Sequence, residues 1–293
     1  MTNTTQDRKP TDELRGADAM APRTVLVTGA TGKTGHRVFE RLVARGVRVR
    51  PGSRSGGVVF DWADANTWGP ALYGADAAYV AYYPDLAAPG SEDAMRLFGS
   101  VAAANGVRRI VLLSGRGEPE AARAESALRE TCPDLTVVRS AFFAQNFSEG
   151  AMVEGVLAGT VAFPGADTAE PWLDVDDLAD VVVHALTEDG HAGQTYELTG
   201  PRLLTFGEVT AELSRATGRE IHYAPVSGAQ YAQTLTQYGM PTPEAEWLAG
   251  LFTTLLDGHN ASTTDGVKRV LGREPRDFAE FARDAAAAGD WHV

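Results

Sequence analysis

The sequence predicts an α/β fold with a doubly wound, mainly parallel sheet and a smaller C-terminal lobe. From Thr24 onward, short runs of β-branched residues alternate with amphipathic helical segments, a pattern typical of βαβ units. A glycine-rich turn directly after the first run marks a junction between a strand and a helix. The 293 residues, of which 44% are hydrophobic, are enough to bury one large core.

Six runs are predicted as strands of the sheet. They are residues 24–28, 47–50, 58–60, 77–82, 109–113 and 135–139. Helices are predicted between them at residues 33–45, 63–72, 91–105 and 118–130. Gly46 and Gly106 come just past two of these helices, where a left-handed residue commonly ends a helix, and a strand follows each directly.

The alternation weakens after residue 143. A helix is predicted at 174–186, a strand at 194–198, and a helix at 205–217 that begins with a capping box of Thr205 and Glu208. Residues 144–170 and 220–275 carry aromatic residues, Met, Gly and Pro without sheet periodicity, so we expect them in a lobe over the carboxyl ends of the strands. The hydrophobic stripe at 244–256 favours packing within that lobe over a dimer contact or a substrate wall.

Several classes of protein are disfavoured by composition. A net charge of −13 with a pI near 4.9 would repel a phosphate backbone, which argues against direct nucleic-acid binding. The polar residues 1–22 predict a disordered leader, and because the chain has neither a signal core nor a membrane-length apolar run, we expect a cytoplasmic protein without membrane contact. Cys132 is the only cysteine, and the six histidines lack metal-ligand spacing, so no metal site is expected.

The turn after the first strand has the spacing of a dinucleotide-binding loop. Gly29 permits a tight turn, Gly32 allows the backbone to approach a pyrophosphate, and Gly35 allows the helix to pack closely on the sheet. The pyrophosphate would then accept hydrogen bonds at the N-terminus of the helix. The other predicted contacts in this turn are Thr31, Lys33 and Thr34. A Walker A loop would need a glycine five positions before Gly32, where the chain has Val27.

This loop predicts a Rossmann-type fold and a division of the chain. We expect a disordered leader at 1–22, a dinucleotide-binding core at 23–145, and a substrate lobe at 146–293 with elements that return to the core.

The second strand favours NADP(H) over NAD(H). An NAD site usually has a carboxylate there for the ribose 2′-hydroxyl, but the chain has none between residues 41 and 60. Arg50, Ser53, Arg54 and Ser55 occur there instead, and a guanidinium beside hydroxyls suits a 2′-phosphate. Arg54 is the predicted main contact, assisted by Ser53 and Ser55; the alternative is a solvated arginine.

Asp61 and Trp62 follow the third strand, where a Rossmann chain meets the adenine. Asp61 would accept a hydrogen bond from the adenine amino group, or it would cap the following helix.

Several segments together resemble the NmrA-like branch of the atypical short-chain dehydrogenase/reductases. They are residues 28–35, 53–55, 60–62, 113–115, 139–147, 172–177 and 196–201, within a similarity that runs from 24 to about 285. Residues 32–34, with 53–55 and 61–62, are particularly similar to the ergot-alkaloid reductases of the festuclavine dehydrogenase type. The resemblance implies NADP(H) in an extended groove. The residues that it adds to the cofactor site are Tyr82, Tyr83, Ser114, Gly115, Phe142 and Phe143.

The chain departs from ketone-reducing members of that superfamily, which use a Tyr-x-x-x-Lys pair as proton donor. None of the eight tyrosines has a lysine four residues later. Ser114 remains the candidate catalytic residue that orients a substrate carbonyl, or it bonds only the backbone. Further candidate substrate contacts are Tyr83, Asn146 and Glu118, whose charge would favour a cationic substrate unless it is simply a solvated helix start.

The resemblance and the missing pair leave two main hypotheses. One is an NADPH-dependent reductase of a small electrophile such as an iminium, an enone or a quinone, because such acceptors need little general acid. The other is a non-catalytic NADP(H)-binding redox sensor that acts through a protein partner. An isomerase or epimerase is a third, and either a monomer or a homodimer is compatible with the sequence.

Overall fold

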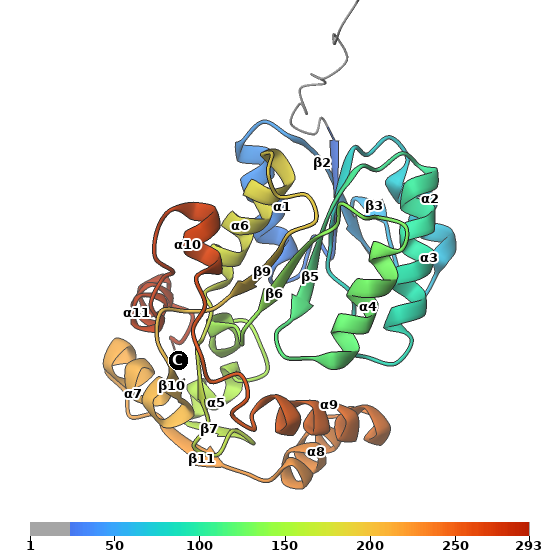
Figure 1. Ribbon diagram of the computed structural model, residues 1–293. Helices are drawn as coiled ribbons and strands as arrows, with labels where there is room; N and C mark the ends of the chain where they lie inside the picture. The colour runs from blue at the N-terminus through green and yellow to red at the C-terminus, as the bar shows by residue number, and fades with distance from the viewer. Residues whose placement is uncertain (1–23, 293) are drawn as a thin grey trace, which may run out of the picture.

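The computed structural model describes residues 24–292, so the predicted leader at 1–22 lies outside the described residues. A seven-stranded, fully parallel sheet forms the centre of the molecule, in the order β3-β2-β1-β4-β5-β6-β9 (Figure 1). The strands are β1 (Thr24–Thr28), β2 (Arg48–Ser53), β3 (Val58–Val59), β4 (Ala77–Val80), β5 (Arg109–Gly115), β6 (Thr136–Ser140) and β9 (Thr195–Leu198). The predicted doubly wound α/β fold is therefore confirmed.

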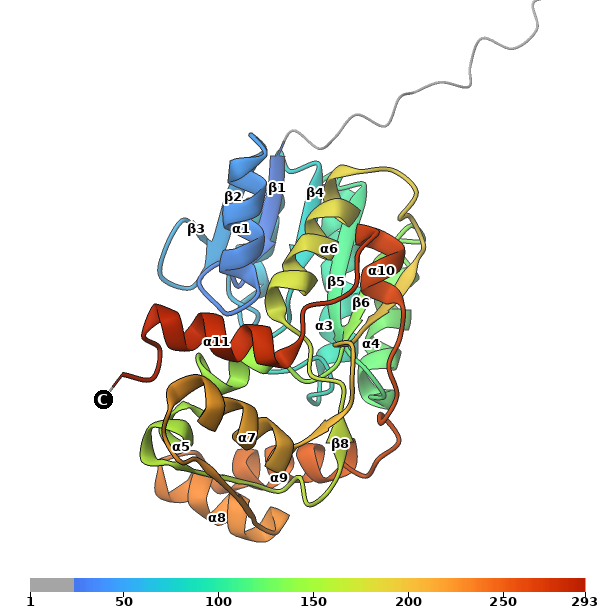
Figure 2. The ribbon, with the colours of Figure 1, turned by 90° about the vertical axis from the view of Figure 1, so that its left-hand side faces the viewer.

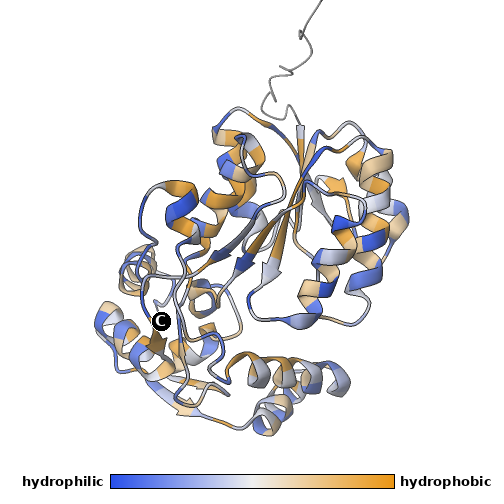
Figure 3. Cartoon of the chain, viewed as in Figure 1, coloured by the Kyte–Doolittle hydropathy of each residue, from blue (hydrophilic) through white to orange (hydrophobic). Residues whose placement is uncertain are grey.

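Helices cover both faces of this sheet. One face carries α1 (Gly35–Ala44), α6 (Val175–Thr187) and α10 (Gly266–Leu271), and the other carries α2 (Trp68–Leu72), α3 (Ser91–Ala104) and α4 (Pro119–Arg129) (Figures 1 and 2). Each layer has its own buried apolar cluster against the strands. Figure 3 shows that hydrophobic residues run along the central strands, whereas the flanking helices alternate hydrophobic and hydrophilic residues.

The chain reverses its direction of winding between β1 and β4. From β1 it goes outward to β2 and β3, and it then returns to the other side of β1 to form β4. Open α/β sheets bind ligands outside the carboxyl ends of the strands at such a switch point.

A smaller lobe lies below the carboxyl ends of the strands (Figure 1). Its elements are α5 (Val153–Ala158), β7 (Thr160–Phe163), β8 (Ala169–Glu170), β10 (Leu204–Thr205), α7 (Phe206–Thr217), β11 (His222–Pro225), α8 (Gly228–Gln237), α9 (Thr242–Leu255) and α11 (Phe278–Ala288). They enclose an aromatic core that includes Phe147, Trp172 and Phe206. Between residues 24 and 292, no helix is both long and apolar enough to cross a bilayer.

Several local predictions are confirmed. Gly46 and Gly106 have φ angles of +75° and +76°, as left-handed helix ends require. The capping box of Thr205 and Glu208 forms both of its hydrogen bonds at the start of α7. Asp174 caps α6, which therefore begins one residue later than predicted.

The predicted helix at 63–72 was wrong, and short strands in the lobe were not predicted. The single helix at 63–72 is a 3₁₀ turn at Ala65–Thr67 followed by the short α2, which contains Gly69 and Pro70. Residues 144–170 and 220–275 do contain strands, because β7 pairs with β11 and β8 with β10. These strands have two to four residues, too few to show a period of two.

Candidate functional site

Glycines shape the turn between β1 and α1. Gly29 has a φ of +61°, and a Cβ on Gly35 would lie only 2.1 Å from the carbonyl oxygen of Gly29. The N–H of Gly32 donates to the same oxygen at 2.8 Å. Three other N–H groups of the turn have no hydrogen-bond partner in the described part of the chain: Thr31, Lys33 and Thr34. A turn with free N–H groups at a helix N-terminus fits the pyrophosphate of a dinucleotide.

Lys33 connects this turn to the segment after β6. Its Nζ donates to Oδ1 of Asn146 at 2.6 Å and lies 6.0 Å from the centre of the Phe143 ring. Burial lowers the pKa of Lys33 to about 8, with the charge of Glu149 opposing the effect. The structure thus brings together a predicted phosphate contact, Lys33, and a predicted substrate contact, Asn146.

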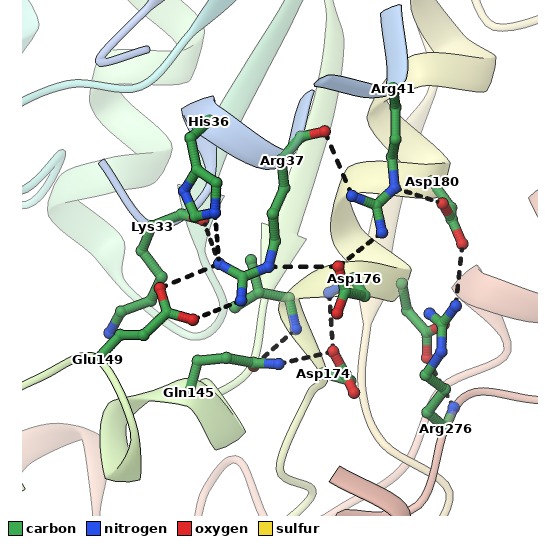
Figure 4. A network of polar contacts seen from close by, with 12 residues as sticks. Lys33, His36, Arg37, Arg41, Gln145, Glu149, Asp174, Asp176, Asp180 and Arg276 are labelled. Carbon is green, nitrogen blue, oxygen red and sulfur yellow. Dashed lines mark hydrogen bonds and ion pairs between the residues drawn. The ribbon is translucent and has the colours of Figure 1, made fainter. Parts of the chain in front are cut away.

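A network of ion pairs holds this segment against α1 and α6 (Figure 4). Arg37 is ion-paired with Glu149 and with Asp176, the latter at 3.2 Å. Arg41 also binds Asp176, at 2.6 Å. These residues were not predicted as part of a site; the two arginines four positions apart on one helix face were the available signal.

The arginines of the second strand have different surroundings. Arg50 donates to the carbonyl oxygens of Ala71 and Pro70 and thereby ends α2, so it is engaged in the fold. Arg54 is exposed, and its guanidinium lies 5.3 Å from the centre of the Tyr83 ring. No carboxylate of the described residues forms an ion pair with Arg54, which leaves its donors available to an anion.

The hydroxyl of Ser53 is occupied by its own loop. It donates to the carbonyl of Gly56 at 2.7 Å and accepts from the N–H of that residue at 2.8 Å. Ser53 therefore shapes the loop that presents Arg54, while the neighbouring Ser55 is exposed.

The loops after β3 and β4 also meet. The Trp62 indole packs against the Tyr82 ring, with 5.0 Å between the ring centres. Its N–H donates to the carbonyl oxygen of Ala81 at 2.8 Å.

The carboxylate of Asp61 accepts from the N–H of Ala63 at 3.0 Å, which closes a local turn before the following helix begins. Asp64 caps that helix by accepting from the N–H of Asn66, so the capping alternative for Asp61 was wrong.

Ser114 is buried at the end of β5. Its hydroxyl donates to Glu125 of α4 at 2.6 Å, and Glu125 in turn binds the Arg139 guanidinium at 2.7 and 2.9 Å. The predicted role in orienting a carbonyl would require Ser114 to give up this bond. The contact favours the structural alternative, although the partner is a side chain and not the backbone.

Glu118 lies directly above the end of β5. A Cβ on Gly115 would lie 2.1 Å from the Glu118 carboxyl carbon, so the carboxyl group folds back against Gly115 and would have to move aside for a larger residue. Burial, followed by the charge of Asp85, raises the pKa of Glu118 to about 8. Burial also raises the pKa of Asp85, which lies in the loop after β4. Asp85 was not predicted as a site residue, because only the pairing of β4 with β5 brings the two loops together.

Aromatic side chains connect β6 to the lobe. Phe142 packs against Trp172 and against Phe252 of α9, with distances between ring centres of 5.8 Å and 5.9 Å. The predicted stripe at 244–256 thus contributes to packing within the lobe through Phe252, which also contacts Phe163 at 4.9 Å.

Two further features bear on where a ligand could bind. A cavity of about 920 Å³ lies between α8 and α9, but none of the predicted site residues lines it. In the part of the chain that the structure describes, no group of three His, Cys, Asp or Glu side chains is arranged to hold a metal ion.

Comparisons with known proteins cover almost the whole chain. An azoreductase of Xenophilus azovorans, named as using NAD(P)H, is 30% identical over 293 residues, which cover 90% of this chain and 98% of that protein. The agroclavine dehydrogenase of Claviceps fusiformis is 31% identical over 285 residues, which cover 89% of this chain and 96% of the relative. No protein-family model matches the chain.

Solved structures support the fold. The triphenylmethane reductase of Citrobacter sp., determined as a complex with NADP(H), superposes with a TM-score of 0.73 at 21% identity and covers 89% of this chain and 99% of its own. At this level of identity the likeness shows a shared fold.

Proposed function

Because the chain belongs to the NmrA-like branch of the atypical short-chain dehydrogenase/reductases, we propose that it is an NADPH-dependent reductase of a small electrophile. The turn at Gly29–Gly35 carries this proposal, since its free N–H groups at the start of α1 fit a pyrophosphate. The names of two relatives, an NAD(P)H azoreductase and an agroclavine dehydrogenase, support redox chemistry with a nicotinamide cofactor.

Arg54 supports NADPH as the preferred form. It is exposed, forms no ion pair within residues 24–292, and rests on the Tyr83 ring beside the switch point. A planar guanidinium held in this way can donate two hydrogen bonds to a 2′-phosphate. Trp62 and Tyr82, packed together in the adjoining loops, would border the adenosine.

The expected substrate class follows from the missing tyrosine and lysine pair. Bound NADPH supplies a hydride, and an iminium, an enone or a quinone accepts it without a strong acid to polarise it. The protein would hold the acceptor among Tyr83, Asn146 and Glu118, with Phe142 and Phe143 as the apolar wall. Residues 146–293 would supply most of the substrate lobe.

Incubation of the protein with NADPH and each class of acceptor tests the proposal. We expect oxidation of NADPH above the rate without protein for at least one of a quinone, an enone and a cyclic iminium, and slower oxidation of NADH. Tight binding of NADPH without oxidation in any of these mixtures would contradict a reductase and favour the redox sensor.

A further inference from the structure

The Glu118 carboxyl group has no structural partner. Within the described part of the chain it forms no side-chain hydrogen bond and no ion pair, and it does not cap α4, although Glu118 occupies the N-cap position. Gly115 leaves the space into which this carboxyl group folds. The Glu118 carboxyl group is half-buried and unpaired, and it fills the space that a Cβ at position 115 would enter. Neither packing nor helix capping explains this arrangement.

The neighbouring acids are already engaged. Glu125 accepts from Ser114 and from the guanidinium of Arg139, so both of its oxygens are engaged. Glu120 is exposed and pairs with Arg123 at 3.1 Å. Burial raises the pKa of Asp85 as well, but its carboxyl group accepts from the N–H of Ala87 at 2.7 Å, which opposes that effect and ties the group to its own loop. Glu118 is therefore the member of this group that is free to carry a proton.

From this geometry we propose that Glu118 is the proton donor for neutral acceptors, in place of the missing tyrosine. The proposal rests on the reductase function proposed above and extends it to the second half of the reaction. Its position over the end of β5 places the carboxyl group where the strands of an open α/β sheet meet their ligands.

The surroundings of Glu118 keep it protonated at neutral pH. The charged and titratable groups facing it are Asp85 from the loop after β4, Glu120 and Glu125 from α4, and His259, whose Nε2 lies 3.2 Å from the carbonyl oxygen of Gly117. Burial and the three acidic neighbours raise the pKa of Glu118 to about 8. The acid form therefore predominates below that pH, and the donor is lost as the pH rises through it.

The proton balance distinguishes two kinds of acceptor. A quinone takes a hydride, that is two electrons and one hydrogen, from NADPH. It then forms an O–H bond with the proton of Glu118. The O–H bond of Glu118 breaks in this step, and water reprotonates the carboxylate that is left. An iminium is neutralised by the hydride alone and needs no proton. Loss of Glu118 should therefore slow the reduction of a quinone much more than that of an iminium.

The experiment compares wild type with Glu118→Gln at saturating NADPH, with a quinone and with a cyclic iminium, from about pH 6 to about pH 10. Glu118→Gln should lower kcat for the quinone about 100-fold at neutral pH. It should abolish the decline of kcat above pH 8 and leave the Kd for NADPH unchanged. Glu120→Gln is the matched control and should keep both the rate and the alkaline decline. Asp85→Asn should move that decline to lower pH, because it removes a like charge.

Infrared spectra of the protein without NADPH supply an independent readout. The difference between the spectra of the wild type and Glu118→Gln should contain the band of a protonated carboxyl group at neutral pH and lose it above about pH 9. The subtraction removes the contribution of Glu170, whose pKa burial raises to about 7. If Glu118→Gln keeps the quinone rate and the alkaline decline while the wild type is active, the donor role is wrong and the reductase function stands. If the wild type reduces none of the acceptors, the reductase function is wrong and the donor role is wrong with it. The infrared result on the proton of Glu118 does not change that conclusion.

Discussion

The Lys33 ammonium group lies 2.6 Å from the amide oxygen of Asn146, although 113 positions separate the two residues. This bond joins the turn that fits a pyrophosphate to the segment proposed to face the substrate. The ion pair of Arg37 with Glu149 joins α1 to the same segment, and that of Arg37 with Asp176 joins α1 to α6 (Figure 4). Cofactor binding and substrate binding are therefore expected to depend on one shared side chain.

Replacement of Lys33 by methionine should weaken NADPH binding about tenfold, as the loss of one charge-assisted contact with a phosphate would do. Because burial lowers the pKa of Lys33 to about 8, the wild-type affinity should fall as the pH rises through that value, when the ammonium group loses its charge. Calorimetric titrations at about pH 7 and about pH 9.5 measure both effects. Lys268→Met, at an exposed lysine paired with Glu274, is the control and should change neither.

Substitution of Arg54 by glutamate should reverse the cofactor preference. The affinity for NADP⁺ should fall about 100-fold, because a bidentate donor is replaced by a like charge, whereas the affinity for NAD⁺ should stay the same or rise. The measured quantity is the ratio of the two dissociation constants. Arg48→Gln, at an exposed position at the start of β2, should leave that ratio unchanged. An unchanged ratio in Arg54→Glu would show that the 2′-phosphate binds elsewhere.

Gly35→Ala should both destabilise the chain and abolish dinucleotide binding. The added Cβ would lie 2.1 Å from the Gly29 carbonyl oxygen, so the turn must move, at a cost of about 2 kcal/mol in the free energy of unfolding. Gly250→Ala in α9 is the control, because no atom lies within 4 Å of its Cβ, and there the substitution should be neutral or stabilise by up to about 1 kcal/mol. Urea denaturation measures both, and equal values for the two variants would contradict the tight turn.

Asp177→Ala should cost about 3 kcal/mol in the free energy of unfolding. The carboxylate is fully buried in α6, binds the backbone N–H and the guanidinium of Arg276, and lies 2.7 Å from Arg273. Its loss would release the segment that leads to α11. Asp93→Ala, at an exposed carboxylate of α3, should change the stability by less than about 1 kcal/mol. A small effect of Asp177→Ala would mean that the lobe does not depend on this anchor.

Local patterns predicted the core of the fold well. The strand at 24–28 and the glycine turn after it require only β-branched residues, a glycine triplet and a helical pattern, and all three are local in sequence. The contacts of Arg54 with Tyr83 and of Trp62 with Tyr82 were not predicted, because β2 and β3 lie on the other side of β1 from β4 and only the packed loops bring these side chains together.

The remaining features depend on contacts between distant segments. Nothing in the sequence near Ser114 shows that Glu125 takes its hydroxyl, and nothing near Asp85 shows that Glu118 lies beside it. Arg50 and Arg54 look equivalent in sequence, but only Arg50 reaches the carbonyls that end α2. These assignments require the packed structure, because they are decided by which side chains are already engaged.

Calorimetric titration of the wild-type protein with NADPH and with NADH is the decisive measurement of cofactor binding at the turn between β1 and α1. We expect one site per chain, with micromolar or tighter affinity for NADPH, weaker affinity for NADH, and loss of both in Gly35→Ala. Absence of binding by either dinucleotide, or undiminished binding in Gly35→Ala, would contradict the placement of the cofactor at the turn between β1 and α1.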